Sequence, residues 1–313
     1  MIFPQQNLSK HQKMVKLTML NWLWKIISSL LALIFGKKKE NKKGNNDYET
    51  IIVDRSIGDG IAKIIFNRPR KKNAFNSKMY NEISQVLNEL SDDNTVKACI
   101  ITGAGDFYSS GNDLANFSTI MHPLAMAKKA RNICDMFVSA FINFKKPLIG
   151  IINGPAIGIA ATTLGMFDRI YVTERTYFKT PFAELGQSPE GCSSFIFPKI
   201  MGEKLAYEVL WESKKLTAEE ALKSKFIHEI LPMGEIENIA IKYCQKLISN
   251  KTIEEIQLLH WPIKENLVNK LKEINQDELN VLQRKWVSKE CFLALATFLE
   301  SKNLYFAATV LRY

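Results

Sequence analysis

The sequence has few of the residues that build metal sites or activated nucleophiles. Its 313 residues include five cysteines and four histidines, with no Cys-x-x-Cys pair and no spacing typical of a zinc site. The cysteines are odd in number and have mostly apolar neighbours, which favours buried free thiols in a reducing compartment over disulfides. The histidines are far apart and belong to no recognisable motif. We therefore expect no metal, and a Ser–His or Cys–His nucleophile is disfavoured.

Acidic residues are almost missing from the first 46 residues, which hold nine lysines and one glutamate. This segment has a net charge of +8, so residues 47–313 carry only +2 of the chain's total of +10. A nucleic-acid-binding face places its basic residues on the folded domain, whereas here they lie in the tail. We therefore expect no nucleic-acid partner.

The tail has one apolar run, and this run is short for a membrane span. Residues 19–35 are interrupted by Asn21 and Lys25, and their length is at the lower limit for a spanning helix. Three interpretations stay open: a cleaved organelle-targeting peptide, which the missing acids favour and the missing arginines oppose; a membrane anchor flanked by lysines; or an amphipathic or disordered leader. Residues 1–47 are expected to be a tail and solvated linker.

From residue 49 onward, strand patterns alternate with helical patterns, which predicts an α/β fold. Two β-branched runs separated by a turn signal, 49–54 and 61–66, indicate a hairpin. Further strands are expected at 96–103, 147–154 and 169–174. Helical spacing predicts helices at 77–90, which Asn76 caps, at 126–144 and at 157–166.

The last hundred residues are expected to be helical. They carry almost no strand signal, and Thr217 and Glu220 form a capping box at the start of a helix. Leucine-spaced helical patterns continue from there to about Leu299.

Two of the predicted strands end in glycine-bearing loops that lead into helices. These loops are YSSGNDL, residues 108–114, and NGPAIGIA, residues 153–160. Such a turn directs backbone N–H groups toward a ligand, and two donors of this kind can form an oxyanion hole for a carbonyl. Taken alone, either loop is more typical of a simple tight turn.

A third loop, GQSPEGCSS at residues 186–194, carries a single acid between apolar segments. That acid is Glu190, and in most proteins an acid in a Pro/Gly loop is a solvated surface residue. The combination of the three loops favours another interpretation, because together they supply two fixed amide donors and one base.

Together these segments resemble the enoyl-CoA hydratase/isomerase (crotonase) superfamily, and most closely its mitochondrial and peroxisomal Δ3,Δ2-enoyl-CoA isomerase branch. The resemblance extends from about residue 48 to about residue 299. It rests on FNRPRKKNAFN (66–76), YSSGNDL (108–114), NGPAIGIAATTLGMFD (153–168) and TPFAELGQSPEGCSSFIFPKIMG (180–202). It implies a crotonase-like spiral of β-β-α turns at residues 48–215, a C-terminal helical region at 216–300 and a tail at 301–313. It also implies a homo-trimer or hexamer.

The resemblance implies a role for particular residues. The oxyanion donors fall on the backbone N–H groups of Asn112 and Ile159. The substrate-binding residues that it implies are Ser109, Ser110, Gly111, Asn112, Asp113 and Gly158. Asp113 has a simpler interpretation as a carboxylate at a helix N-terminus. Lys71 and Lys72 lie in the loop expected near the coenzyme A phosphates, where they either pair with phosphate or stay solvated.

The resemblance also distinguishes between reactions. Hydratases of this superfamily use two glutamates, whose positions fall here on Thr162 and Phe182, and neither residue can act as a general base. Isomerases use one glutamate on the later loop, and that position is Glu190. The implied activity is a Δ3,Δ2-enoyl-CoA isomerase with an acyl-CoA substrate and no separate cofactor. Two alternatives stay open: another crotonase-type reaction such as thioester hydrolysis, and a non-catalytic acyl-CoA-binding protein.

The tail and the resemblance together predict a mitochondrial location. A peroxisomal location, or membrane association through residues 19–35, is the alternative. Peroxisomal members often end in a Ser-Lys-Leu-type signal, whereas this sequence ends in Leu-Arg-Tyr, which argues against import by that signal.

Overall fold

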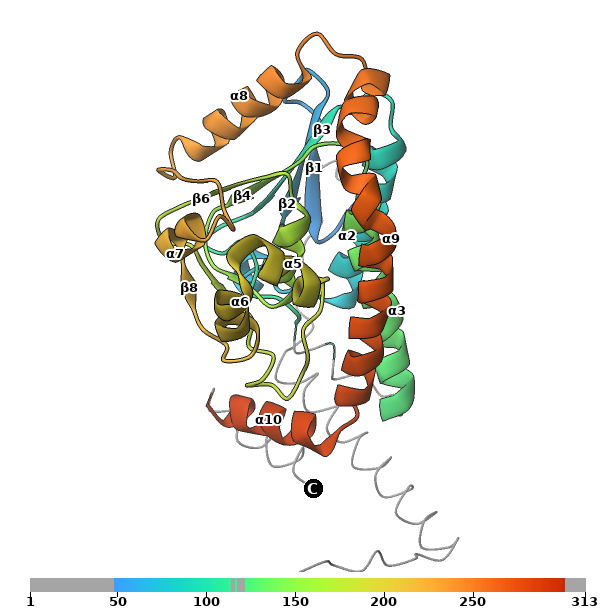
Figure 1. Ribbon diagram of the computed structural model, residues 1–313, viewed down its shortest axis with the longest axis vertical. Coiled ribbons are helices and arrows are strands. Elements are labelled where there is room, and N and C mark those ends of the chain that lie inside the picture. Colours follow the sequence, from blue (N-terminus) through green and yellow to red (C-terminus); the bar gives the residue numbers. More distant parts are fainter. Residues whose placement is uncertain (1–47, 114–115, 117–121, 302–313) are drawn as a thin grey trace, which may run out of the picture.

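The structure is a computed structural model that describes residues 48–113, 116 and 122–301 (Figure 1). The predicted N-terminal tail, with its apolar segment at residues 19–35, lies outside the described residues, as do residues 302–313. In the part that is described, no helix has both the length and the apolar character that a bilayer crossing requires.

Six strands form the larger sheet, in the order β1-β2-β3-β4-β6-β9. Their bounds are Ile51–Asp54, Ile61–Phe66, Ala98–Gly103, Leu148–Ile152, Arg169–Val172 and Glu229–Ile230. β1 and β2 pair antiparallel, which confirms the predicted hairpin, and the remaining neighbours pair parallel. All five residues of β4 are buried, as expected for a parallel strand covered on both faces.

A second sheet of three short strands was not predicted. It has the order β5-β7-β8, with bounds Ala156–Ile157, Tyr177–Lys179 and Leu216–Thr217. Strands of two or three residues are too short to show a hydrophobic period in the sequence. For the same reason β9 was not predicted and lies in a stretch that was expected to be helical.

The helices agree with the prediction in part: the first two lie close to the predicted ranges 77–90 and 126–144, whereas the two between residues 193 and 210 were not predicted. Their bounds are Ser77–Asp92 (α2), Pro123–Ile142 (α3), Ile159–Thr162 (α4), Ser193–Met201 (α5), Glu203–Leu210 (α6), Ala218–Lys223 (α7), Ile236–Ile248 (α8), Ile253–Lys285 (α9) and Lys289–Glu300 (α10), with 3-10 turns at Pro69–Lys71 (η1) and Thr163–Met166 (η3). The Asn76 side chain accepts a hydrogen bond from the N–H of Met79, and the predicted capping box of Thr217 and Glu220 is present. The single helix predicted at 157–166 is wrong, because β5, α4 and η3 divide that stretch.

The larger sheet separates two hydrophobic clusters. Along β3, Cys99 and Ile101 point into the cluster that includes α2 and α3, whereas Ile100 points into the cluster beneath α8. This alternation is the period of two that a strand imposes. Figure 1 shows α9 running beside α3 along one side of the molecule, with α8 at the other side of the sheet. The α/β expectation is therefore confirmed.

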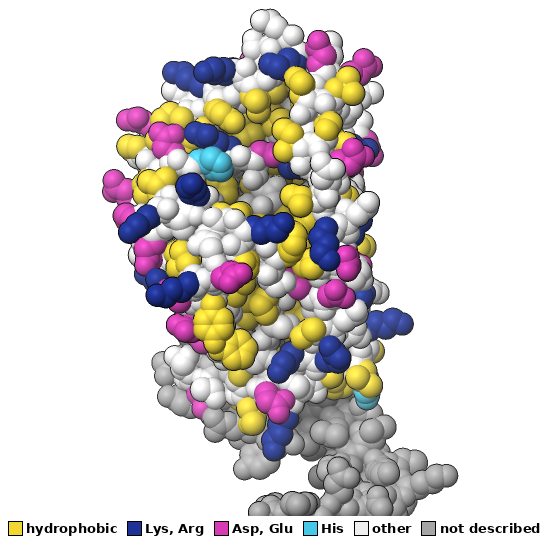
Figure 2. Space-filling model, viewed as in Figure 1, with side chains coloured by type: hydrophobic (Ala, Val, Ile, Leu, Met, Phe, Trp, Pro, Cys, Tyr) yellow, Lys and Arg dark blue, Asp and Glu magenta, His cyan; other side chains and the backbone are white. Residues whose placement is uncertain are grey.

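The face seen in Figure 2 carries charges of both signs. Lys and Arg side chains are interspersed with Asp and Glu side chains, and hydrophobic side chains lie between them in small groups. Much of the length of this face is formed by α5, α6 and α9 (Figure 1). No single charge sign dominates the part of this face that is described.

Candidate active site

The two predicted amide loops lie directly against each other. Ser109 and Ala156 form a parallel bridge, in which the Ser109 N–H donates to the Pro155 carbonyl at 3.2 Å and the Ile157 N–H donates to the Ser109 carbonyl at 3.0 Å. These bonds pair the first loop with β5, at the edge of the second sheet. The backbone itself therefore sets the spacing between the two loops.

Gly111 permits this close approach. Its φ is +80°, and a Cβ placed on it would lie 2.6 Å from the Ile157 carbonyl oxygen and 3.8 Å from the Gly158 Cα. Any other residue would force the loops apart or strain the backbone. Among residues 48–113, 116 and 122–301, neither the Asn112 N–H nor the Ile159 N–H has a hydrogen-bond acceptor. Within the described residues, both amide N–H groups are therefore unpaired.

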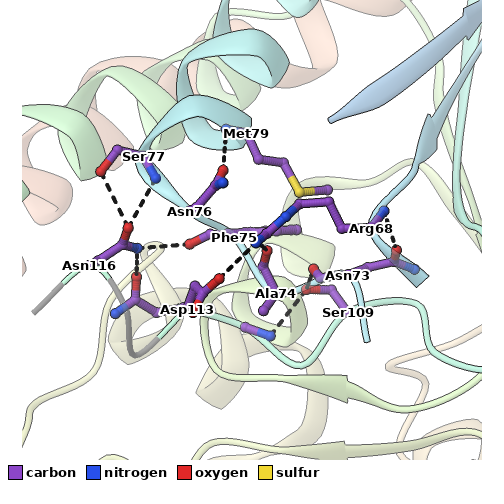
Figure 3. Close-up of polar contacts among 12 residues, drawn as sticks. Arg68, Asn73, Ala74, Phe75, Asn76, Ser77, Met79, Ser109, Asp113 and Asn116 are labelled. Carbon is purple, nitrogen blue, oxygen red and sulfur yellow. Dashed lines mark hydrogen bonds and ion pairs between the residues drawn. The ribbon is translucent and has the colours of Figure 1, made fainter. Parts of the chain in front are cut away.

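Side chains and backbone of the preceding loop fix residues 109–113 (Figure 3). The Ser109 hydroxyl donates to the Asn73 carbonyl at 2.8 Å and accepts from the Gly111 N–H at 3.0 Å. The Asp113 carboxylate pairs with Arg68 at 2.9 Å. Asp113 thus has a structural partner, so its simplest role is to hold the loop in place.

The predicted coenzyme A lysines are exposed and close to this loop. The Lys72 carbonyl accepts a hydrogen bond from the Ser110 N–H at 2.9 Å, and the Lys72 ammonium lies 4.9 Å from the centre of the Phe107 ring. Lys71 ends the short turn η1 on the same surface. The arrangement leaves both charges where an anionic group can approach, and their contact with phosphate stays a prediction.

Glu190 lies in an interior position, contrary to the usual behaviour of an acid in a Pro/Gly loop. It is 8% exposed, and its Oε2 accepts a hydrogen bond from the Cys134 thiol of α3 at 3.5 Å. Burial raises the pKa of Glu190 to about 7; the Cys134 hydrogen bond acts in the lowering direction, and the charge of Glu278 adds to the rise. At neutral pH this carboxyl is therefore available both as a base and as an acid.

Gly191, which follows Glu190 in the sequence, packs against the second amide loop. Gly191 has a φ of +69°, and a Cβ on it would lie 2.5 Å from the Thr162 hydroxyl and 3.5 Å from Ile159 Cδ1. The loop that carries the acid is thus packed against α4, whose first residue is the predicted donor Ile159. The three loops singled out in the sequence meet in one place.

A pocket joins these elements. Its empty space is about 740 Å³, part of it open to solvent, and its polar lining includes Tyr80, Asn112, Cys134 and Glu190. Its apolar lining comes from α3 and from the end of α9: Met126, Ala127, Ala130, Ile133 and Trp286. Ile159 and Gly158 do not line it; they pack against the glycines of the other two loops, Gly191 and Gly111. The pocket offers one carboxylate and an apolar wall to a ligand.

Thr162 and Phe182, the positions of the hydratase glutamates, have no catalytic geometry. Both are buried, and the Thr162 hydroxyl donates to the Ile159 carbonyl at 3.2 Å. Neither lines the pocket. Met166 and Phe167 belong to the hydrophobic core. In the described part of the chain, no group of three His, Cys, Asp or Glu side chains is placed to hold a metal ion.

Sequence reasoning missed two residues around Glu190. One is Cys134, whose thiol meets the carboxylate; the other is Glu278 of α9, which is buried and binds the start of α5. A weak signal for Glu278 existed, because Leu271, Asn275, Glu278 and Leu282 fall on one helical stripe, and all four are buried. A charge on such a stripe indicates a specific partner, but the sequence does not name it.

Comparisons with known proteins agree with this architecture. Residues 56–308 match the family described as enoyl-CoA hydratase/isomerase. Human "Enoyl-CoA delta isomerase 2" is 44% identical over 262 residues, which cover 82% of this chain and 64% of the relative. Mouse "Enoyl-CoA delta isomerase 3, peroxisomal" is 38% identical over 274 residues, covering 85% of this chain and 83% of the relative. The chain thus spans less than two thirds of the length of the human relative.

The solved structures show the same fold. An enoyl-CoA hydratase/isomerase from Pseudoalteromonas atlantica T6c superposes with a TM-score of 0.74 at 22% identity, covering 81% of this chain and 98% of that protein. The expected crotonase-like spiral with a C-terminal helical region is confirmed. By family match, identity and fold, this chain belongs to the enoyl-CoA hydratase/isomerase family.

Proposed function

We propose that this protein is a Δ3,Δ2-enoyl-CoA isomerase, which moves the double bond of a 3-enoyl-CoA to give the 2-trans-enoyl-CoA. One observation carries the proposal: Glu190 is buried in a pocket, with a pKa raised to about 7, and its loop packs against α4, which begins at Ile159. A base with a pKa near the working pH is the most effective proton shuttle. The isomerase names of the relatives support the same reaction.

In the proposed reaction, Glu190 removes a proton from the second carbon of the acyl chain. The negative charge moves onto the thioester oxygen, where the N–H groups of Asn112 and Ile159 stabilise it as an enolate. Protonated Glu190 then delivers the proton to the fourth carbon. One acid suffices because the proton leaves and returns on the same face of the substrate.

The remaining predicted residues have supporting roles in this proposal. Ser109 and Gly111 hold the first donor in place, because their own hydrogen bonds and close contacts fix the loop. The apolar lining contributed by α3 is suited to an acyl chain. In this proposal Lys71 and Lys72, both exposed, contact the coenzyme A phosphates, for which a compact ammonium group is a suitable partner.

Glu190→Gln tests the proposal directly. We expect turnover of a 3-enoyl-CoA to fall about 10²- to 10⁴-fold, the usual contribution of a positioned acid–base group. The control is Glu184→Gln, which neutralises a half-exposed carboxylate of the same segment that pairs with Lys179, and it should keep the wild-type rate. Full isomerase activity in Glu190→Gln would refute the assignment.

The same assay separates the alternatives. Saturated acyl-CoA converted to free acid and coenzyme A would indicate thioester hydrolysis with Glu190 activating water. Substrate bound without any turnover would indicate a non-catalytic acyl-CoA-binding protein. We expect neither, because the pocket is lined by an acid–base group of suitable pKa and by Asn112, one of the two proposed donors.

We also propose a homo-trimer or hexamer that works in the mitochondrion. Support for self-association comes from exposed hydrophobic residues on α9, where Leu258, Leu259 and Ile263 are 74%, 61% and 75% exposed. Light scattering measures the assembly state. Imaging of the tagged full chain, with peroxisomal and mitochondrial markers, measures the location, and loss of residues 1–46 should abolish mitochondrial targeting.

A further inference from the structure

Glu278 is a buried acid whose hydrogen bonds all go to the segment that follows Glu190. It is 8% exposed and lies on α9, far from the loop in sequence. Its Oε2 accepts from the Cys192 N–H at 2.7 Å, and its Oε1 accepts from the Ser194 N–H at 2.9 Å and the Ser194 hydroxyl at 2.5 Å. Burial raises the pKa of Glu278, and the hydrogen bonds from Ser194 and Cys192 act against that rise by favouring the ionised carboxylate.

The backbone that Glu278 holds is in an unusual conformation. Gly191 and Cys192 are both left-handed, with φ of +69° and +61°, and such a conformation costs energy at a residue with a side chain. This turn connects Glu190 to α5. In addition, the Glu190 carbonyl accepts from the Ser193 hydroxyl at 2.7 Å, so the turn and the catalytic residue are one hydrogen-bonded unit.

The same helix also fixes the opposite side of the Glu190 carboxylate. Asn275 and Gln276 of α9 both donate to Asp135 Oδ1, each at 2.8 Å. Asp135 follows Cys134, whose thiol donates to Glu190. α9 therefore determines where the carboxylate and its thiol partner lie relative to one another.

From these contacts we propose that Glu278 is a positioning residue for Glu190: it holds the left-handed turn at Gly191 and Cys192 and thereby orients the catalytic carboxylate toward the pocket. The proposal deepens the proposed isomerase function and rests on it. Glu278 touches neither the pocket nor a substrate, because it is not among the residues that line the pocket.

Charge is the second part of this role. The groups that interact with Glu278 are Glu190 and Cys192 from the loop, Ser194 from α5 and Cys134 from α3. No cation is among them in the described residues. The negative charge of Glu278 therefore acts in the direction that raises the pKa of Glu190.

Three variants separate position from charge. Glu278→Gln keeps the length, loses the charge and leaves one backbone donor without an acceptor. Glu278→Asp keeps the charge but is too short to reach both donors. Asp277→Asn is the control, because Asp277 is the neighbouring acid on the exposed side of α9.

We expect Glu278→Gln to lower kcat about 10- to 100-fold with little change in KM, the size of effect that a misplacement of about 1 Å produces. In this variant kcat/KM should begin to rise at a lower pH than in wild type, because the negative charge of Glu278 no longer raises the pKa of Glu190. Glu278→Asp should lower kcat and leave the pH of that rise unchanged, and Asp277→Asn should match wild type in both. A purely structural role predicts a lower melting temperature with the wild-type pH profile, and that result would overturn the proposal.

A measurement without turnover keeps this inference distinct from the proposed function. Carbon-13 NMR of the glutamate carboxyls, with Glu190→Gln to assign the signal, gives the pKa of Glu190 directly. A lower pKa in Glu278→Gln, together with faster hydrogen exchange at the amides of Cys192 and Ser194, supports the role of Glu278 even if wild type fails to isomerise 3-enoyl-CoA. An unchanged pKa and unchanged exchange would refute it even if the isomerase activity is found.

Discussion

The two halves of the candidate site are held in different ways. The amide loops at residues 109–112 and 156–159 are fixed by backbone hydrogen bonds and by the absence of a side chain at Gly111. The loop that carries Glu190 is fixed instead by side chains from distant helices, with Cys134 on α3 and Glu278 on α9. One half is therefore built mainly by the main chain, with added side-chain bonds such as that of Ser109 to the Asn73 carbonyl, and the other half by side chains of distant helices.

This difference separates two requirements of the chemistry. An oxyanion hole needs donors at fixed positions and no titratable group, so backbone geometry is sufficient. A proton shuttle needs a carboxyl with a tuned pKa, which only burial and neighbouring side chains can provide. Most side-chain substitutions should therefore leave the amide loops intact, whereas conservative changes near Glu190 should alter activity.

Adding a side chain at Gly111 gives the largest expected effect on the main-chain half. A Cβ in Gly111→Ala would lie 2.6 Å from the Ile157 carbonyl oxygen, so the loops must separate and the two donors diverge. Loss of one oxyanion donor typically lowers turnover 10²- to 10³-fold, and we expect a loss of about that size in kcat.

The matched control is Gly58→Ala. Gly58 has a similar φ of +86°, but its added Cβ would meet nothing within 4 Å. Both variants should lose stability from backbone strain, and only Gly111→Ala should lose turnover. Equal kcat values for the two variants, measured on 3-enoyl-CoA, would show that the spacing of the loops does not matter.

The same difference explains what the sequence could predict. The hairpin, the first helix with its Asn76 cap, the parallel strands and the three loops follow from local patterns, and the structure has them close to the predicted bounds. The amide loops are signalled by glycine because their geometry is local. Glu190 was found only through its combination with these loops and through resemblance to a family.

Long-range contacts were not predictable in this way. Cys134 precedes Glu190 and Glu278 follows it, each by more than fifty residues, and no sequence motif links either residue to Glu190. The strands β5 and β9, with two residues each, were missed because such a short element leaves no period. The single helix expected at 157–166 failed because a positive φ at Gly158 separates β5 from α4.

The pH dependence of the free energy of unfolding tests how much the burial of Glu190 destabilises the folded protein. The folded-state pKa of Glu190 is about 7, above the 4.5 of an ordinary glutamate, so the folded state loses stability as pH rises from about 4.5 to 7. Glu190→Gln removes that loss. The difference in free energy of unfolding between Glu190→Gln and wild type should therefore grow in favour of the variant by about 3 kcal/mol from acid to alkaline pH. This follows from 1.36 kcal/mol for each unit of pKa shift.

Urea unfolding at pH 5 and at pH 9 measures this difference. The half-exposed Glu184 provides the control, and Glu184→Gln should show no such growth of stability with pH. If the difference in free energy of unfolding between Glu190→Gln and wild type is the same at both pH values, burial does not raise the pKa of Glu190. The proposed difference between the two halves of the site would then be wrong.

The smallest expected effect comes from Cys134→Ala. Its thiol donates to the Glu190 carboxylate at 3.5 Å and thereby acts to lower the pKa of that group. Without it the pKa of Glu190 rises, so the increase of kcat/KM with pH should move up by at most about one unit, the value of one hydrogen bond. Above that pH the rate should equal wild type. Cys244→Ala, which removes a buried thiol beneath α8, should leave the profile in place, and a shift to lower pH in Cys134→Ala would contradict the proposed contact.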